Sequence, residues 1–257
     1  MIKKQRRVFL NAVMFFTRIP CPEIKDFQES EMEQSRCYFS LIGILVGAIG
    51  FGVFYGATFI LPTPVAIILS LTATLLTTGA LHEDGFADMV DGFGGGWKRE
   101  RILEIMKDSH IGAFGVIALI LLFALKFTLL LAILPQLNGL YTLALFLCMH
   151  SLSRACASIL MYQLKYVREE SSSKVKSLTT PLSSSSLAMI MFFGLLPLLL
   201  FQPHWKLTLA AIPCVVAALI MGLYIKKKIG GYTGDCLGAT QQVCELVFLM
   251  TITAYLQ

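Results

Sequence analysis

The residues best suited to chemistry are four acids in the segment HEDGFADMVDG, residues 82–92. If this segment is helical, Asp84, Asp88 and Asp91 lie on one narrow face, because spacings of four and seven residues nearly complete one and two turns. Three carboxylates so close repel each other unless a cation neutralises them. A hard divalent ion such as Mg²⁺ accepts carboxylate oxygens and leaves room for substrate phosphate oxygens. The pattern predicts a metal-dependent phosphoryl-transfer site.

The spacing also limits how a metal is held. Asp84 and Asp91 would lie about 10 Å apart along a helix axis, so either two ions or one ion on an adjacent pair is expected. Gly85 and Gly92 each weaken a helix by about 1 kcal/mol relative to alanine, which indicates close approach of a ligand or a neighbouring backbone. The alternative is a solvated acidic cap at the end of a membrane helix.

Two further candidates lie at the edges of apolar runs. The segment 97–109, WKRERILEIMKDS, is amphipathic and predicts a surface helix that brings Asp108 back toward the membrane, as a metal ligand or as a solvated charge. The glycine-rich segment 230–235, GGYTGD, precedes the last apolar run. Its backbone N–H groups and the following helix N-terminus would cradle a phosphate, although Asp235 would equally serve as an N-cap.

Arg154 falls inside an apolar run. A charge there costs at least about 2.5 kcal/mol on insertion scales, so it must have a partner. Arg154 would either clamp a substrate phosphate or pair with Glu245, the one acid of the last apolar run. Lys126, in another run, is expected to face a polar partner, and His150 is expected to be a polar packing residue.

Composition defines the elements that must position these residues. The 257 residues are 56% hydrophobic and 14% charged, and the mean hydropathy is +0.73, which predicts an integral membrane protein. We expect one all-α domain over residues 1–257, a polytopic membrane helix bundle of about seven transmembrane helices with amphipathic cytoplasmic helices. The expected spans are Tyr38–Leu61, Pro64–Leu81, Ile111–Leu134, Leu140–Leu164, Leu187–Phe201, Leu207–Ile225 and Gly238–Leu256.

The distribution of basic residues predicts the orientation. If the N-terminus is cytoplasmic, 18 of the 21 Lys and Arg residues fall in four inside segments. These segments are 1–37, 82–110, 165–186 and 226–237. The first would be a cytoplasmic or interfacial segment, and the Ser-rich stretch Ser171–Ser186 a loop that acts as a lid or a linker. The acidic motif would face the compartment that holds nucleotides and Mg²⁺.

Three separated motifs carry a resemblance to a known family. They are HEDGFADMVDG at 82–92, LEIMKDSHIGAFG at 103–115, and GYTGDCLGA at 231–239 followed by Glu245. Together with FTRIP at 16–20 and YFSLIG at 38–43, they resemble cobalamin synthase, the adenosylcobinamide-GDP ribazoletransferase family. The resemblance runs in order from about residue 9 to residue 255, and so covers nearly the whole chain.

The resemblance implies a Mg²⁺-dependent enzyme of the cytoplasmic (inner) membrane that joins adenosylcobinamide-GDP to α-ribazole, giving adenosylcobalamin and GMP. Metal would be held by Asp84, Asp88, Asp91 and Asp108. A carboxylate or His82 would take the hydroxyl proton, although His82 points away from the Asp face of an ideal helix. The candidates for contact with substrate phosphates are Lys107, Arg154, Gly231, Thr233, Gly234 and Asp235.

The chain departs from the family pattern at three positions. Family members often carry glycine where Ala80 stands, an apolar residue where Glu83 stands and arginine where His110 stands. None of these removes an expected metal ligand. They put in doubt only whether Glu83 adds a ligand and whether His110 contacts a phosphate.

Two other classes stay open. CDP-alcohol phosphotransferases, which act on lipids and release CMP, also set spaced aspartates at a helix end, but place an Ala-Arg pair where Ala87 is followed here by Asp88. A transporter would use the acids as an ion relay near the midplane. The acids instead fall at a predicted membrane edge, and no inverted repeat is evident.

The remaining composition excludes some partners. Seven cysteines show no CxxC or zinc spacing, so we expect no disulfides. The net charge of +5 is explained by topology and contact with anionic lipid, and we expect no nucleic-acid partner. Substrates and the lipid bilayer are the expected partners, with a homo-oligomer or other biosynthetic enzymes left open.

Overall fold

Long apolar helices make up most of the computed structural model, which describes residues 2–22, 28–168 and 179–257. Within these ranges the only pairing of the β type is a single bridge between Tyr166 and Tyr232, so the predicted all-α class is confirmed. The α-helices are α1 (Ile2–Phe16), α2 (Glu29–Ser35), α3 (Phe39–Ala57), α4 (Thr63–Thr78), α5 (Leu81–Gly95), α6 (Arg99–Ile105), α7 (Ala113–Ile133), α8 (Gly139–Gln163), α10 (Ser184–Leu195), α11 (Ala211–Ile229) and α12 (Gly234–Leu256).

The predicted polytopic bundle is confirmed. Among the described residues, six helices are long and apolar enough to cross a membrane, and the number is seven if the bent pair α4–α5 is counted as one span. The short fifth run begins earlier than expected, at Ser184, and continues through the 3₁₀ helix Leu196–Phe201. Residues 171–178 of the predicted Ser-rich loop lie outside the described residues.

The bend between α4 and α5 creates the platform for the acidic motif. The predicted span to Leu81 is wrong at its end, because α4 stops at Thr78 and the next helix leaves at 87°. Gly79 and Ala80 both adopt the left-handed conformation, with φ of 66° and 59°. Glycine takes this conformation freely, whereas alanine is strained in it. We therefore treat α4 as the crossing part of the pair and α5 as a helix at the end of the bundle.

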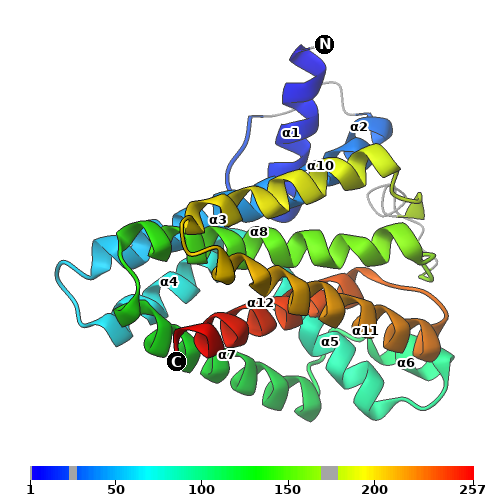
Figure 1. Cartoon of the computed structure of the whole chain (residues 1–257). Helices are drawn as coiled ribbons and strands as arrows, with labels where there is room; N and C mark the ends of the chain where they lie inside the picture. Colours follow the sequence, from blue (N-terminus) through cyan, green and yellow to red (C-terminus); the bar gives the residue numbers. More distant parts are fainter. Residues whose placement is uncertain (1, 23–27, 169–178) are drawn as a thin grey trace.

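The core is centred on α8 and α12 (Figure 1), which lie between α3 and α10 on one side and α7 and α11 on the other. α8 is buried along most of its length. Gly43 and Gly47 let α3 pack closely on α8, because a Cβ there would collide with the backbone of His150 and Phe146. Gly52 and Gly56 face open space.

The segments predicted to share one face do lie together, at the end of the bundle that carries α5 and α6 (Figure 1). Arg99 Nε donates to the Ile229 carbonyl at 2.9 Å, and Arg168 Nη2 donates to the Met106 carbonyl at 2.9 Å. The Tyr232 N–H donates to the Lys165 carbonyl at 2.9 Å. We call residues 82–110, 165–168 and 226–237 the loop end.

Two predicted surface helices are also present. Residues Ile102 and Met106 of the amphipathic segment are buried, and α6 forms there as expected. α1 projects from the bundle in Figure 1 and is tied to α2 by an ion pair between Arg7 Nη2 and Glu31 Oε1 at 2.6 Å. Val8 lies on the buried face of α1, while its basic residues are mostly exposed, which agrees with the predicted amphipathic character.

Candidate functional site

The acidic motif forms a helix, α5, as the spacing predicted. Its glycines are positions of close backbone approach. A Cβ on Gly85 would meet the Asp235 Cα at 2.8 Å, and one on Gly92 would meet the Ile102 carbonyl oxygen at 3.1 Å. On the facing helix, a Cβ on Gly238 would meet the His82 carbonyl oxygen at 3.0 Å. The expected neighbour is therefore protein backbone, and α12 packs directly against α5.

This packing brings Asp235 to Asp84 and Asp88, and we call these three residues the acid cluster. Asp84 is exposed and Asp88 is half-buried. Burial, followed by the negative charges of Asp235 and Asp84, raises the pKa of Asp88 to about 7. Arg168 Nη2 pairs with Asp235 Oδ2 at 2.8 Å. Among the described residues, three carboxylates thus lie together with an ion pair to Arg168, and the site carries an excess of negative charge.

The sequence did not predict this convergence, because Asp235 was assigned to a phosphate cradle. Asp235 lies about 150 residues beyond the motif in the chain, and periodicity within α5 gives no information about it. The available signal was Gly85 and Gly238, since small residues on two helices permit close packing of their backbones.

Asp91 caps another helix. Its Oδ2 accepts the Gly112 N–H at 2.7 Å, and its Oδ1 accepts the Gly115 N–H at 2.8 Å, at the N-terminus of α7. A Cβ on Gly112 or Gly115 would collide with this carboxylate. The structure therefore uses Asp91, which is buried, to satisfy backbone donors that a helix start leaves unpaired.

Asp108 and Lys107 are both exposed at the end of α6. Asp108 Oδ1 accepts the His110 N–H at 3.0 Å, and this bond holds the pKa of Asp108 below its usual range. Within residues 2–22, 28–168 and 179–257, no three His, Cys, Asp or Glu side chains are already grouped for a metal ion. The predicted shell of four aspartates is thus not preassembled.

The glycine-rich segment 230–235 has structural roles in the loop end. Gly230 ends α11 with a φ of 78°, and a Cβ on Gly231 would collide with the Lys165 carbonyl. The N-cap of α12 is Thr233, whose hydroxyl accepts the Cys236 N–H at 3.3 Å, so the alternative that Asp235 is the cap is wrong. Asp235 is instead in the first turn, facing Arg168.

A cavity of about 140 Å³ opens beside the acid cluster, and we call it the apolar cavity. Asp84, Asp235 and His82 line it, and the His82 ring stacks on Phe39 with centroids 5.9 Å apart. The remaining lining is formed by Phe15, Phe16, Phe39, Leu81, Met161, Gly234, Leu237 and Gly238.

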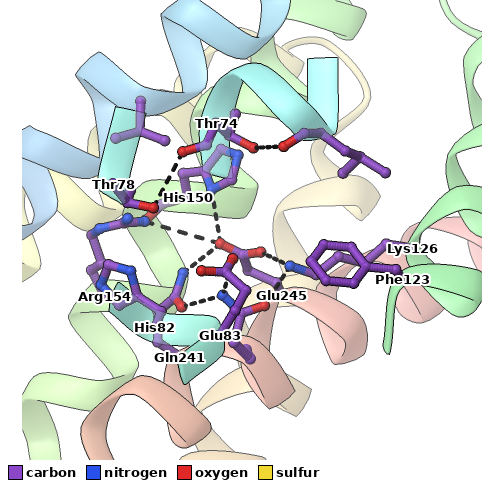
Figure 2. A pocket seen from close by; sticks show the side chains of 13 residues that line it. Thr74, Thr78, His82, Glu83, Phe123, Lys126, His150, Arg154, Gln241 and Glu245 are labelled. Atoms are coloured by element: carbon purple, nitrogen blue, oxygen red, sulfur yellow. Dashed lines mark hydrogen bonds and ion pairs between the residues drawn. The ribbon is translucent and has the colours of Figure 1, made fainter. Parts of the chain in front are cut away.

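A second group of charges is enclosed within the bundle (Figure 2). Glu245 accepts from Lys126 Nζ at 2.5 Å and lies 2.8 Å from His150 Nδ1 and 4.0 Å from Arg154 Nη1. We call these four residues the buried ion cluster. Gln241 also donates to Glu245. Of the two arrangements left open for Arg154, the structure has the pair with Glu245, and the polar partner expected for Lys126 is confirmed.

The buried ion cluster is connected to α5. Gln242 Nε2 donates to Glu83 Oε1 at 2.9 Å, and Gln242 also accepts from Lys126. A cavity of about 10 Å³, lined in part by Glu83, His150 and Arg154, lies between them and has the size of one water molecule. Glu83 therefore belongs to this interior network, and it points away from the acid cluster.

Comparison with known proteins gives one consistent result. The model of the family described as cobalamin-5-phosphate synthase matches residues 8–253. A Shewanella amazonensis protein named adenosylcobinamide-GDP ribazoletransferase is 42% identical over 97% of this chain and 96% of its own length. A Vibrio cholerae protein of the same name is 40% identical over 100% of this chain and 97% of its own. No solved structure matches the chain significantly.

Proposed function

Because the chain belongs to the cobalamin-5-phosphate synthase family, we propose that it transfers the adenosylcobinamide phosphoryl group from adenosylcobinamide-GDP to α-ribazole, forming adenosylcobalamin and GMP. The reaction would take place at the cytoplasmic face of the inner membrane. The relatives named adenosylcobinamide-GDP ribazoletransferase support this proposal along nearly the full chain. The structural observation that carries it is the convergence of Asp84, Asp88 and Asp235 at an accessible end of the bundle.

The acid cluster fits Mg²⁺. Its donors are hard carboxylate oxygens, and a divalent cation would offset the burial and the neighbouring negative charges that raise the pKa of Asp88. Asp84 and Asp88 would hold the ion, with Asp235 beside them and substrate phosphate oxygens completing the shell. When bound, Mg²⁺ would neutralise charge that grows on the phosphate oxygens in the transition state.

The proposed reaction is a single displacement at phosphorus. A ribose hydroxyl of the acceptor forms a new O–P bond to the phosphorus that carries the cobinamide, and the bond from this phosphorus to the oxygen of GMP breaks. The hydroxyl proton passes to a carboxylate of the acid cluster.

The positive groups around the site would orient the donor. Arg168 donates to Asp235 and to the Met106 carbonyl, and these two bonds fix its guanidinium beside the acid cluster. Lys107 is exposed directly after α6, so its charge is not desolvated by burial. The proposal assigns contact with the pyrophosphate to these two side chains, whereas Arg154 lies inside the bundle against Glu245.

The proposal is tested by GMP release from adenosylcobinamide-GDP, with and without α-ribazole and Mg²⁺, together with detection of adenosylcobalamin. Release should require all components and fall at least about a hundredfold in Asp84→Asn and Asp88→Asn, because a Lewis acid supplies several kcal/mol. Glu104→Gln, a change at an exposed acid of α6, is the matched control and should retain activity. Folded protein that releases no GMP, or that releases CMP from a CDP-lipid, would contradict the proposal.

A further inference from the structure

We propose that the apolar cavity binds the aromatic base of the acceptor nucleoside. This inference rests on the proposed function, since it identifies where one of its two substrates lies. The cavity is formed by α1, α3, α5, α8 and α12, and it shares Asp84 and Asp235 with the acid cluster.

The size and lining of the cavity favour a small, flat, apolar ring system. Its volume is about 140 Å³. A dry apolar protein cavity of about 150 Å³ accommodates benzene. The walls include the rings of Phe15, Phe16 and Phe39 and the side chains of Met161 and Leu237, which suit the face of an aromatic ring. A corrin ring is far too large for this space, whereas a benzimidazole matches it.

The chemistry of the walls also separates the two bases present in the reaction. Guanine carries the acceptors O6 and N7 as well as N–H donors, and each group left unpaired on burial weakens binding by roughly tenfold. The polar side chains that line the cavity are those of His82, Asp84 and Asp235. The two carboxylates accept hydrogen bonds, so they could pair with guanine N–H groups but would supply no donor to its O6 and N7. A benzimidazole has an apolar outer edge, and its methyl groups gain from burial among Phe and Leu side chains.

The position of the cavity fits the reaction geometry. With the base inserted between α1 and α12, the proposal places the ribose beside Asp84 and Asp235, two of the residues that line the cavity. The attacking hydroxyl is then next to the acid cluster. His82 forms part of the wall with its ring stacked on Phe39, so it would contact the base edge and help to fix its orientation.

The first arm of the test uses the wild-type enzyme and a series of acceptors. α-Ribosides of 5,6-dimethylbenzimidazole, 5-methylbenzimidazole and benzimidazole are compared by acceptor KM. Each methyl removed should raise KM by about fourfold, from about 0.8 kcal/mol per buried carbon. The α-riboside of adenine should be poorer still, because it buries unpaired polar groups. Equal KM values across the series would overturn the proposal.

The second arm uses cavity variants. Leu237→Trp fills the cavity and should raise the acceptor KM at least about tenfold while leaving the donor KM unchanged. Met161→Ala enlarges it and should reduce the difference between the dimethylated and unmethylated acceptors. Leu223→Trp, at a position 72% exposed on α11, is the matched control and should change neither constant.

The outcomes separate the possible occupants. A rise in donor KM alone in Leu237→Trp would assign the cavity to guanine, and no change in either KM would assign it to lipid or to packing; both results overturn the proposal. If Leu237→Trp does not fold, Met161→Ala and the acceptor series decide. If the wild-type enzyme forms no adenosylcobalamin with any acceptor, the proposed function fails, whereas product formation without these effects rejects the base site alone.

Discussion

The acid cluster and the buried ion cluster both place charged side chains of α12 next to other helices, but they balance charge differently. Glu245 is 1% exposed and has Lys126, His150 and Arg154 around it. At the loop end, Asp235 lies with Asp84 and Asp88, and the ion pair recorded for the cluster is to Arg168. The two sites are about 15 Å apart along α12, at 1.5 Å per residue.

This difference shows which site is prepared for a ligand. A charge within a membrane bundle must be paired inside the chain, because neither water nor free ions relieve it there. The buried ion cluster is paired in this way. An excess of carboxylates at an accessible end persists only if a cation from solution completes it. We therefore propose that the imbalance of the acid cluster is the functional feature, and that the balance of the buried ion cluster is a structural one.

The largest effect on stability is expected when the charge balance of the buried ion cluster is removed. Glu245→Gln leaves Lys126 and Arg154 buried without their carboxylate, and should lower the free energy of unfolding by about 3–5 kcal/mol. Thermal unfolding in detergent and the yield of folded protein measure this. Lys126→Met combined with Glu245→Gln should recover part of the loss. A Glu245→Gln protein of normal stability would show that the interior charges are not coupled.

Asp91→Asn distinguishes a helix cap from a metal ligand. The variant should lose about 1–2 kcal/mol of stability, because a charge-assisted bond at the N-terminus of α7 is weakened. GMP release by the folded fraction should fall much less than in Asp88→Asn. If Asp91→Asn kept its stability but lost its activity, Asp91 would be a metal ligand and not a helix cap.

The pH dependence of Mg²⁺ binding tests whether the acid cluster, in contrast to the buried ion cluster, takes a cation from solution. Asp88 has its pKa raised to about 7, so it is mostly protonated at pH 6 and ionised at pH 8. Since a metal binds the ionised form, Mg²⁺ affinity should weaken about tenfold from pH 8 to pH 6. In metal-free protein the raised pKa makes stability fall as pH rises from about 4 to 7, because the folded state holds the proton more tightly than the unfolded chain.

Both pH effects should become smaller together in Asp88→Asn. They are measured by calorimetric Mg²⁺ titration and by thermal unfolding across the pH range. A pH slope of the same size in Asp88→Asn would assign the titration to another group.

The smallest effect is expected at the bend that positions α5. Ala80 has a φ of 59°, and left-handed conformation costs an L-residue about 1–2 kcal/mol. Ala80→Gly removes this strain but adds about 0.4–1 kcal/mol of unfolded-chain entropy, so a net gain below about 1 kcal/mol is expected. Activity should be unchanged. A loss of stability in unfolding measurements would show that Ala80 is not strained.

Much of the fold was predictable because it depends on local composition. The apolar runs, the amphipathic segment that forms α6 and the clustering of basic loops each follow from hydropathy or charge over short windows. The end of α4 had a local signal in Gly79, the left-handed residue that follows Thr78. The bend that follows was not predictable, because Ala80 also takes a conformation that favours glycine.

The chemistry of the site was predictable from the sequence, but the full set of residues that form it was not. The spacing of Asp84 and Asp88 indicated a shared helical face, and both do lie in α5. Asp91 follows the same spacing, yet its carboxylate bonds to α7, and Asp235 joins from α12. Both outcomes depend on which helices pack against α5, a long-range property that periodicity does not encode.

Divalent cation binding tests the central claim most directly. Mn²⁺ is titrated, with detection by electron paramagnetic resonance, into purified protein with adenosylcobinamide-GDP and no acceptor. We expect binding by the wild type and by Glu104→Gln, and at least about tenfold weaker binding by Asp88→Asn, because a carboxylate ligand is lost. Equal Mn²⁺ binding by wild type and Asp88→Asn, or binding that only Asp108→Asn removes, would contradict an ion site at the acid cluster.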